Sequence, residues 1–404
     1  MRITIVGASA IAVSIVSLLY AIARSSAVAA AVAIAILSIV VYDYYSAKSI
    51  SGKIVGVRRI LGSEYVSELG LLDVAIEVEN RLGRYIPLVE VEDILPPMIE
   101  PASRSRFSIS LPPGYVAKVR YSAKVKVPGE HCLDLVSVCV YSPFLMFVNC
   151  FDSRQRSYLV AVPLSPKISF SIRSLSRLVG LVRGLSMHGL YDLESFRDYV
   201  HGDDVRKVVW KVLARDRRLV VRVDRGESTA RIAVILLLRR YAWVVGEPPN
   251  TLAQRVLRAF QSVIDTLSLP GVELDAYFLT SGVPRFVKSV RRGDPRMHSS
   301  YSWVSYLSGF SKSVSELLDL CSSLGIDLER YDFAILVTDL YTLARELDEV
   351  VKTLARTRRG LVIAALDSSV DVDHVALASR CSRRLDAINY DLALVSRELE
   401  VLTQ

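Results

Sequence analysis

The sequence predicts a multi-domain protein: an N-terminal transmembrane helical hairpin, a β-sandwich-like domain and a C-terminal doubly wound α/β domain. Three observations support this prediction. Two long uncharged runs open the chain, short alternating segments separated by turn residues follow, and apolar strands alternate with helical segments in the last part. The chain has 404 residues, of which 51% are hydrophobic and 23% charged, and this composition excludes a mainly disordered protein.

The N-terminal region, residues 1–47, holds most of the apolar excess. Residues 3–23 and 25–42 contain no charged side chain, and each run approaches the ~20 residues with which a helix crosses about 30 Å of hydrocarbon. We therefore expect two transmembrane helices at about 3–23 and 25–45, joined by a tight turn at Arg24. A buried helical hairpin of a soluble core is the alternative, and a cleaved signal peptide fits less well because its apolar core is shorter. Three tyrosines occupy the expected membrane interface: Tyr42, Tyr44 and Tyr45.

The distribution of basic residues predicts the orientation of these spans. Arg2 precedes the first span, and only Arg24 lies in the turn. Four basic residues follow the second span: Lys48, Lys53, Arg58 and Arg59. The positive-inside rule therefore places the soluble domains of this multi-pass cell-membrane protein in the cytoplasm. The five cysteines include no CxxC pair, which agrees with reduced thiols in that compartment and argues against a zinc site.

Residues 48–165 are expected to form a β-rich, immunoglobulin-like sandwich. Apolar and polar residues alternate in 72–78 and 115–127, and turn signals at Pro96–Pro97, Pro112–Gly114 and Ser142–Pro143 separate the runs. Several short strands at this spacing are typical of a sandwich of about 100 residues. The region shows no pattern of catalytic residues, so we interpret it as a packing or docking module.

Residues 166–230 form a basic linker with the densest polar segment of the chain. Thirteen Lys and Arg residues outnumber eight Asp and Glu residues there, so this segment supplies most of the formal net charge of +8. A glycine and two aspartates in it are expected to form a tight turn that begins a helix over 204–214. Dense mixed charge most often serves ion pairing, so one interpretation is a clamp onto the following domain, and the other is a docking surface for a partner protein. The residues that distinguish this segment are Phe196, Arg197, Tyr199, Gly202, Asp203, Asp204, Arg206, Trp210 and Arg215.

Residues 231–404 alternate between apolar strands and helical segments, which predicts a doubly wound α/β domain with a mainly parallel sheet. Continuous apolar runs such as 232–238 are typical of strands buried on both faces. The helix expected over 252–267 has Asn250 or Thr251 at its N-cap. A last helix is expected over 382–402.

The segment 196–227 resembles the signature of domain-of-unknown-function family 58. In that family a Phe-Arg-x-Tyr step, a Gly-Asp-Asp turn, an arginine, a tryptophan and an Ala-Arg pair occur in this order, as they do here. This sequence departs at Val209, where an aspartate usually precedes the tryptophan. The following α/β domain is similar to a von Willebrand factor type A domain, and two N-terminal spans suit the same family. The resemblance implies a membrane-anchored partner of a MoxR-type AAA+ ATPase.

Domains of the von Willebrand factor type A often bind a divalent cation through an Asp-x-Ser-x-Ser motif after the first strand and an aspartate after a later strand, because hard cations prefer converging oxygen ligands. Here the degenerate positions are Arg239, Tyr241 and Trp243, and only Asp339 matches a ligand position. Arginine is always charged and cannot ligate a metal, so we expect no metal and no cofactor. One hypothesis pairs Arg239 or Arg240 with Asp339. In the alternative, both arginines point to solvent and Asp339 only caps the next helix.

These observations predict a non-enzymatic, membrane-tethered interaction or adaptor protein that works with the AAA+ ATPase in assembly or maturation of protein complexes. The alternatives are a ligand-binding or cell-envelope-associated receptor domain and, less favoured, a hydrolase, for which no nucleophile–base pair or facing carboxylates can be recognised. No P-loop motif is present, and no aromatic platform accompanies the short basic pairs. We therefore expect no nucleic-acid partner and no ATP bound by a P-loop of this chain.

Overall fold

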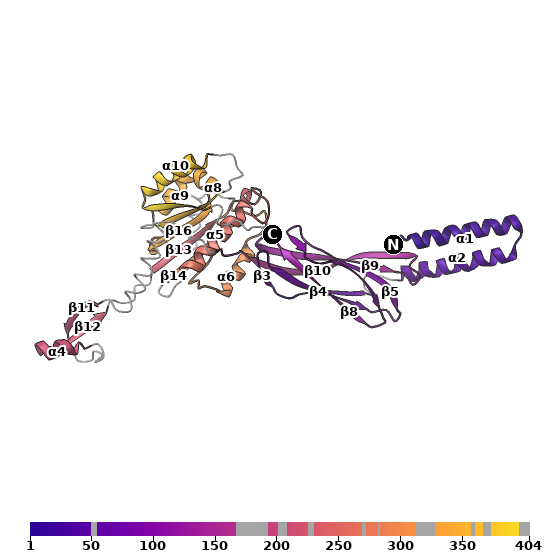
Figure 1. Ribbon diagram of the computed structural model, residues 1–404, viewed down its shortest axis with the longest axis horizontal. Coiled ribbons are helices and arrows are strands. Elements are labelled where there is room, and N and C mark those ends of the chain that lie inside the picture. The colour runs from indigo at the N-terminus through magenta and orange to yellow at the C-terminus, as the bar shows by residue number, and fades with distance from the viewer. Residues whose placement is uncertain are drawn as a thin grey trace. The chain divides into compact units, whose positions relative to one another are not determined.

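In the computed structural model, the chain divides into two compact units, Met1–Ala161 and Val162–Gln404. The first unit holds two helices and a β-sandwich, and the second holds an α/β domain (Figure 1). The structure describes residues 1–49, 55–166, 193–200, 208–224, 230–268, 272–281, 283–311, 328–356, 360–366 and 373–395.

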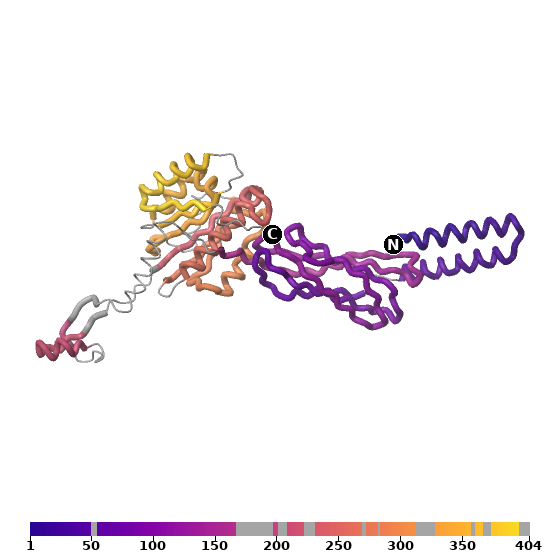
Figure 2. Tube along the Cα trace, viewed as in Figure 1, coloured from indigo at the N-terminus to yellow at the C-terminus, as the bar shows by residue number. Residues whose placement is uncertain are grey.

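Two antiparallel helices, α1 (Ile5–Arg24) and α2 (Ala27–Lys48), open the chain and lie side by side (Figures 1 and 2). They have 20 and 22 residues and are long and apolar enough to cross a membrane. Each starts two residues later than expected, because Thr4 and Ser26 cap them by accepting a hydrogen bond from the first turn. Between them, Ser25 adopts a left-handed φ of 50°, which closes the tight turn.

The first unit also contains a β-sandwich of two antiparallel sheets. One sheet has the order β1-β10-β9-β5-β7, with β3 paired to β10, and the other has the order β2-β4-β8-β6. Alternate residues face a common core between the sheets, and Val74, Val91 and Val138 are buried there. The strands are β1 (Arg2–Ile3), β2 (Val55–Leu61), β3 (Tyr65–Ser67), β4 (Leu71–Asn80), β5 (Ile86–Ile94), β6 (Ile99–Pro101), β7 (Arg106–Leu111), β8 (Val116–Val125), β9 (Gly129–Tyr141) and β10 (Phe147–Val162).

One basic residue that the sequence places at the membrane flank lies elsewhere. Arg59 is buried in the sandwich, where its guanidinium pairs with Asp93 and donates to the carbonyl of Leu133 at 2.8 Å. It therefore carries no weight in the positive-inside argument. Lys53 lies outside the described residues, and Arg58 is exposed on β2.

The second unit is built on a six-stranded sheet with the order β15-β14-β13-β16-β17-β18. Strand β15 runs antiparallel at one edge, and the other five strands are parallel, as in doubly wound α/β domains. The strands are β13 (Ala230–Leu237), β14 (Val272–Leu279), β15 (Arg285–Val287), β16 (Phe333–Asp339), β17 (Gly360–Ala365) and β18 (Tyr390–Val395). Within the described residues from 230 onward, the helices are α5 (Leu252–Leu267), α6 (Pro295–Ser300), α8 (Leu340–Arg345), α9 (Leu347–Leu354), α10 (His374–Asp386) and the 3-10 turns η2 (Arg240–Trp243), η3 (Tyr301–Trp303) and η4 (Leu328–Arg330).

Helices cover both faces of this sheet. On one face α8, α9 and α10 share a core with the sheet that includes Leu237, Leu336 and Cys381. Helix α5 contributes no residue to that core and packs on β13, β14, β16 and β17 from the other face (Figure 1). Its N-cap is Thr251, one of the two expected residues, which forms a reciprocal capping box with Gln254.

The prediction of a last helix over 382–402 is wrong. Helix α10 ends at Asp386, and the next apolar residues form β18, an edge strand parallel to β17. Asn389 has a φ of 61°, a left-handed conformation that asparagine tolerates and that commonly ends a helix. Residues 396–404 lie outside the described part of the chain.

Candidate functional site

The candidate site lies at the carboxyl edge of the α/β sheet, between β13 and β16. These parallel strands are neighbours, with Leu236 paired with Val337, so the residues that follow them meet at one edge. Strand β13 is the first strand of the sheet along the chain, and the strand order runs outward from it in both directions. Ligands of doubly wound domains bind beyond the carboxyl ends of the strands at such a switch point.

Arg239 follows β13 by two residues and forms a nearly buried ion pair at this edge. Its Nη2 donates to both carboxylate oxygens of Glu346, at the junction of α8 and α9. The Arg239 and Glu346 side chains are 11% and 18% exposed. A second donor, Nη1, reaches the carbonyl of Phe310 at 2.7 Å, and the guanidinium carbon lies 5.4 Å from the centroid of the Phe310 ring. Such a pair is screened little by solvent, because both groups have lost most of their water.

Tyr241 and Asp339 form the second polar contact of the site. The Tyr241 hydroxyl donates to the Asp339 carboxylate and lies 2.8 Å from the hydroxyl of Thr342. Asp339 is fully buried and caps α8, accepting from the Thr342 backbone N–H at 2.8 Å and from its hydroxyl at 2.7 Å. Burial, followed by the adjacent Asp339 charge, raises the pKa of the Tyr241 phenol. The phenol therefore stays protonated and remains a hydrogen-bond donor.

The hypothesis that Arg239 or Arg240 pairs with Asp339 is not what the structure shows. Arg239 pairs with Glu346, and Arg240 is exposed at the start of η2. Asp339 caps the next helix, as the alternative interpretation had it, but Arg239 does not point to solvent. The physical reason is that Tyr241 and Thr342 already occupy the Asp339 oxygens.

Trp243, the third position that the sequence compares with the cation motif, is buried and donates its indole N–H to the carbonyl of Ser308 at 2.7 Å. It therefore packs the edge of the domain and presents no oxygen ligand. Among the described residues, no group of three or more His, Cys, Asp or Glu side chains is placed to hold a metal ion. The arrangement can fix the loops at the edge of the sheet and can present a tyrosine that is only partly exposed.

The described signature residues lie on a small β–α–β element. Strands β11 (Leu193–Asp198) and β12 (Val220–Asp224) pair antiparallel, and Phe196 and Arg197 lie on β11. The backbone N–H of Tyr199 donates to the carbonyl of Leu219 at 2.9 Å, which extends the pairing. Four further signature residues lie outside the described residues: Gly202, Asp203, Asp204 and Arg206.

Helix α4 (Trp210–Asp216) carries the other two signature residues. It begins at Trp210, and Val208 forms a β-bridge with Val221, so the helix expected over 204–214 does not continue through this position. Trp210 is 58% exposed, and Arg215 is paired with the adjacent Asp216. No residue of α4 is buried. An exposed indole beside basic side chains is a surface that suits a protein partner.

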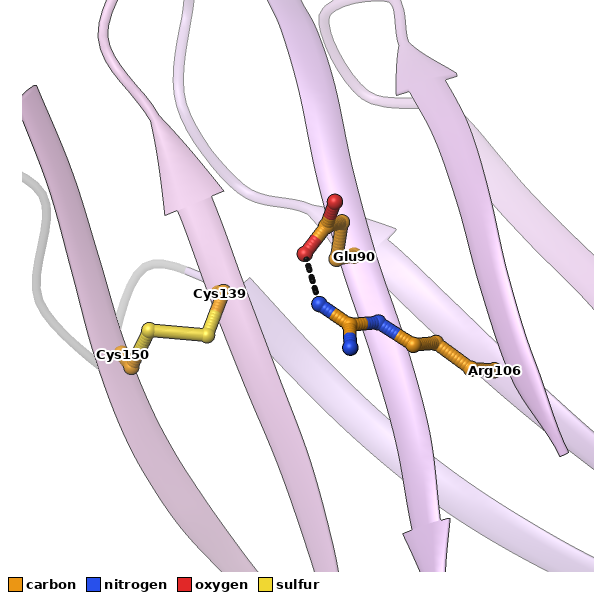
Figure 3. Close-up of a disulfide and its surroundings, with 4 residues drawn as sticks. All are labelled: Glu90, Arg106, Cys139 and Cys150. Carbon is orange, nitrogen blue, oxygen red and sulfur yellow. Dashed lines mark hydrogen bonds and ion pairs between the residues drawn. A yellow bond between two sulfur atoms is a disulfide. The ribbon is translucent and has the colours of Figure 1, made fainter. Parts of the chain in front are cut away.

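A disulfide joins Cys139 of β9 to Cys150 of β10, so the expectation that all five thiols are reduced is wrong. The two residues are directly opposite in the antiparallel register, with Cα atoms 4.0 Å apart. Figure 3 shows the disulfide near Glu90 of β5, which accepts a hydrogen bond from Arg106 at 2.7 Å. Cys150 is exposed and Cys139 is half-buried. Among the described residues, Cys132 and Cys381 are free thiols, and Cys321 lies outside them.

Sequence reasoning missed Glu346, Phe310 and the Cys139–Cys150 pair. The disulfide had a signal, because both cysteines flank the Ser142–Pro143 turn at positions that a tight hairpin places opposite each other. Glu346 had no such signal, since 107 residues separate it from Arg239. Only the packing of α8 and α9 on the sheet brings it to the guanidinium.

No protein-family model matches the chain, and no curated protein sequence matches it. Among solved structures, a CARDB domain from Pyrococcus furiosus is 14% identical with a TM-score of 0.18, covering 27% of this chain and 87% of that chain. The cupredoxin domain of amoB from Nitrosocaldus yellowstonii is 9% identical with a TM-score of 0.20, covering 28% and 90%. A C-terminal portion of native alpha-2-macroglobulin from Escherichia coli is 13% identical with a TM-score of 0.23, covering 27% and 16%. These similarities are too low to carry a functional argument.

Proposed function

We propose that this protein is a membrane-tethered, cytoplasmic adaptor that works with a MoxR-type AAA+ ATPase in the assembly or maturation of protein complexes. The observation that carries the proposal is the exposed signature element on α4, where Trp210 and Arg215 face solvent. Aromatic residues and arginine are enriched at protein interfaces. An acidic patch on the ATPase is the complement to this basic element.

The sheet edge supports an adaptor over a cation-dependent receptor. We propose that the second unit is of the von Willebrand factor A-like kind, because its sheet is doubly wound and Asp339 lies at the carboxyl end of β16. The two carboxylates at the edge, Asp339 and Glu346, are already engaged by Tyr241 and Arg239. A metal cation that bound Glu346 would have to displace Arg239 or lie beside its positive charge. Both are unfavourable, because the two like charges repel each other.

The membrane tether in this proposal consists of α1 and α2, each long and apolar enough to span a bilayer. Arg2, Lys48 and Arg58 lie near the end of the hairpin that leads into the sandwich, and Arg24 lies at the opposite end of the hairpin. This asymmetry favours a cytoplasmic location of the sandwich and of the α/β domain by the positive-inside rule.

The test is co-purification from detergent-solubilised membranes of the native host, with the full-length chain as bait. The expected result is an AAA+ ATPase in the wild-type eluate and its loss with Trp210→Ala. Tyr158→Ala is the matched control, since Tyr158 is an aromatic residue of the sandwich with a similar exposed fraction, 56%. An ATPase that stays bound to Trp210→Ala contradicts the docking surface, and a wild-type eluate without an ATPase contradicts the adaptor proposal.

A cell-envelope-associated role is the second candidate, and the Cys139–Cys150 disulfide is the observation that favours it. Disulfides persist mainly in oxidising compartments, although intracellular proteins of hyperthermophiles are an exception. Protease digestion of intact, wall-free cells separates the two candidates. Digestion of the sandwich from outside supports the envelope role and contradicts the adaptor, whereas protection until the membrane is permeabilised supports the adaptor.

A further inference from the structure

The turn between β9 and β10, residues 142–146, is bonded to the first residues of the helical hairpin. The hydroxyl of Thr4, the N-cap of α1, donates to the carbonyl of Leu145 at 2.6 Å. The backbone N–H of Thr4 donates to the carbonyl of Met146 at 2.9 Å. Just before it, β1 pairs with β10 through Arg2 and Ile3. The turn and the start of α1 are therefore one hydrogen-bonded piece.

Asp43 of α2 makes a second attachment to the same turn. It is fully buried, and its carboxylate accepts from the Ser142 hydroxyl, from the Phe144 N–H at 3.0 Å and from the Met146 N–H at 3.2 Å. A carboxylate in an otherwise apolar helix is costly unless protein donors satisfy it. Here the turn supplies those donors, so both helices hold it.

The length of α1 limits how far this turn can stand from a bilayer. The helix has 20 residues, which at 1.5 Å per residue span about 30 Å. The hydrocarbon core is also about 30 Å thick. All of α1 is then needed to cross it, so the hydrocarbon boundary falls near Ile5, next to the residue that binds the turn.

The side chains at the tip of the turn suit that position. Phe144 is 49% exposed and Leu145 is 37% exposed, although both are large and apolar. The Phe144 ring lies edge-on to that of Tyr42 on α2, with centroids 6.3 Å apart. On the neighbouring turn, Arg84 donates to the carbonyl of Ser46 in α2 at 2.8 Å. Aromatic rings with nearby arginines are typical of the layer of lipid headgroups.

We propose that the 142–146 turn is a third membrane contact of this protein, with Phe144 and Leu145 inserted at the boundary between headgroups and acyl chains. The ligand is the lipid surface itself, and the sandwich is held against it. The inference depends on the proposed spanning of the membrane by α1 and α2. It does not depend on which side of the membrane the sandwich faces.

The test uses the full-length chain in phosphatidylcholine vesicles that carry bromine at a shallow or a deep acyl position, because bromine quenches tryptophan fluorescence on contact. Three substitutions are compared with the wild type, whose Trp210, Trp243 and Trp303 give the baseline. Phe144→Trp reports the turn, Leu18→Trp reports the middle of α1, and Tyr158→Trp is the control on an exposed part of β10. Unchanged thermal unfolding of each variant shows that it folds.

The expected result is extra loss of fluorescence for Phe144→Trp with the shallow bromines and for Leu18→Trp with the deep bromines. Tyr158→Trp is expected to match the wild type. Quenching of Leu18→Trp without quenching of Phe144→Trp overturns the turn contact and leaves the spanning helices intact. Absence of quenching at both positions overturns the membrane tether in the proposed function as well.

Discussion

Each of the two units contains a polar cluster in which an arginine and a tyrosine bind carboxylates, but the two clusters are connected differently. In the sandwich, Arg59 and Tyr121 share the single carboxylate of Asp93, and the Arg59 and Asp93 side chains are 0% exposed. In the α/β domain the roles are divided, because Arg239 binds Glu346 and Tyr241 binds Asp339.

The position of each set explains the difference. Arg59 lies on β2 and Asp93 on β5, so their pair joins the two sheets across the core. Arg59 also donates to the carbonyls of Leu135 and Gln155, at 2.9 and 2.6 Å. The Arg59 guanidinium thus stabilises the sandwich by binding Asp93 and three backbone carbonyls. The α/β set lies at the sheet edge, at the switch point where this class of fold places ligands.

The comparison therefore separates a cluster inside a core from a polar cluster at the carboxyl edge of a sheet. Burial raises the pKa of the phenols in both sets, with a further contribution from the neighbouring carboxylate. Both tyrosines are thus donors at neutral pH. The two clusters should differ in how much the free energy of unfolding of each unit decreases when the carboxylate that binds the arginine is removed.

The largest effect is expected for Asp93→Ala. The substitution leaves the Arg59 charge buried and unpaired, which typically costs about 3–5 kcal/mol. The sandwich should then open, and the amides of β2, β5 and β9 should exchange with deuterium much faster than in the wild type. Hydrogen exchange followed by mass spectrometry reports each unit separately, so the α/β domain serves as an internal reference.

Glu77→Ala is the control for this prediction. Glu77 pairs with Lys118 at 3.0 Å on the same sandwich, but the two side chains are 26% and 40% exposed. Exposed pairs typically contribute only about 0–1 kcal/mol. Equal exchange rates in Asp93→Ala and Glu77→Ala would show that the carbonyl partners of Arg59 stabilise its charge without Asp93. The Asp93 cluster would then not hold the sandwich together, as proposed here.

A smaller loss is expected for Glu346→Gln in the α/β domain. The neutral amide can still accept one hydrogen bond from Arg239, and water reaches part of the site, so we expect a cost of about 1–3 kcal/mol. The exchange of amides in α8 and α9 should increase, and that of the sandwich should not. Glu273→Gln, which alters the exposed pair with Arg231 on the same sheet, should leave exchange close to the wild-type pattern.

Added divalent cations test whether this edge of the sheet binds a metal. Millimolar magnesium or manganese should leave the thermal midpoint of the wild type unchanged, because Asp339 and Glu346 are engaged by Tyr241 and Arg239. Stabilisation of the wild type by either cation would show that this edge binds a metal and that Tyr241 and Arg239 do not keep the two carboxylates from it.

The sequence predicts those parts of the structure that depend on local patterns. Uncharged runs of about 20 residues suffice to identify α1 and α2, and the strand Ala230–Leu237 follows from its continuous apolar residues. The cap of α8 is also local, because Asp339 and Thr342 are three residues apart. The sequence wrongly predicts helix at Tyr390–Val395, because a short apolar run fits a helix or a strand equally well and only pairing with β17 decides between them.

Contacts between distant residues could not be predicted in this way. The sequence places Arg59 at the membrane flank because it follows the second apolar run, yet its partner Asp93 is 34 residues away on the other sheet. The Arg239–Glu346 pair depends likewise on how α8 and α9 lie on the sheet. A basic residue near a membrane segment is therefore weak evidence of orientation until its burial is known.

The smallest effect expected is a dependence of the sandwich on pH through His131. Its side chain is buried and its Nε2 lies 2.7 Å from the Val127 carbonyl, to which the neutral ring donates. Burial lowers the pKa of His131 below its usual value of 6.5. The unfolded chain therefore binds a proton at His131 near pH 6.5, whereas the folded sandwich does not bind it until a lower pH. This contribution to the free energy of unfolding is fully present above pH 6.5 and decreases as the pH falls towards the folded pKa.

Each unit of separation between the two pKa values corresponds to about 1.4 kcal/mol. His131→Gln keeps an N–H donor for Val127 and does not titrate, so it should be less stable than the wild type at pH 7.5 by a small margin yet lose less on acidification to pH 5.5. The measurement is the exchange rate of β9 amides at both pH values, corrected for intrinsic exchange. An equal acid-induced change in the wild type and in His131→Gln would show that other groups cause the pH dependence of the sandwich. A change confined to the α/β domain would show that the pH dependence lies in that domain and not in the sandwich.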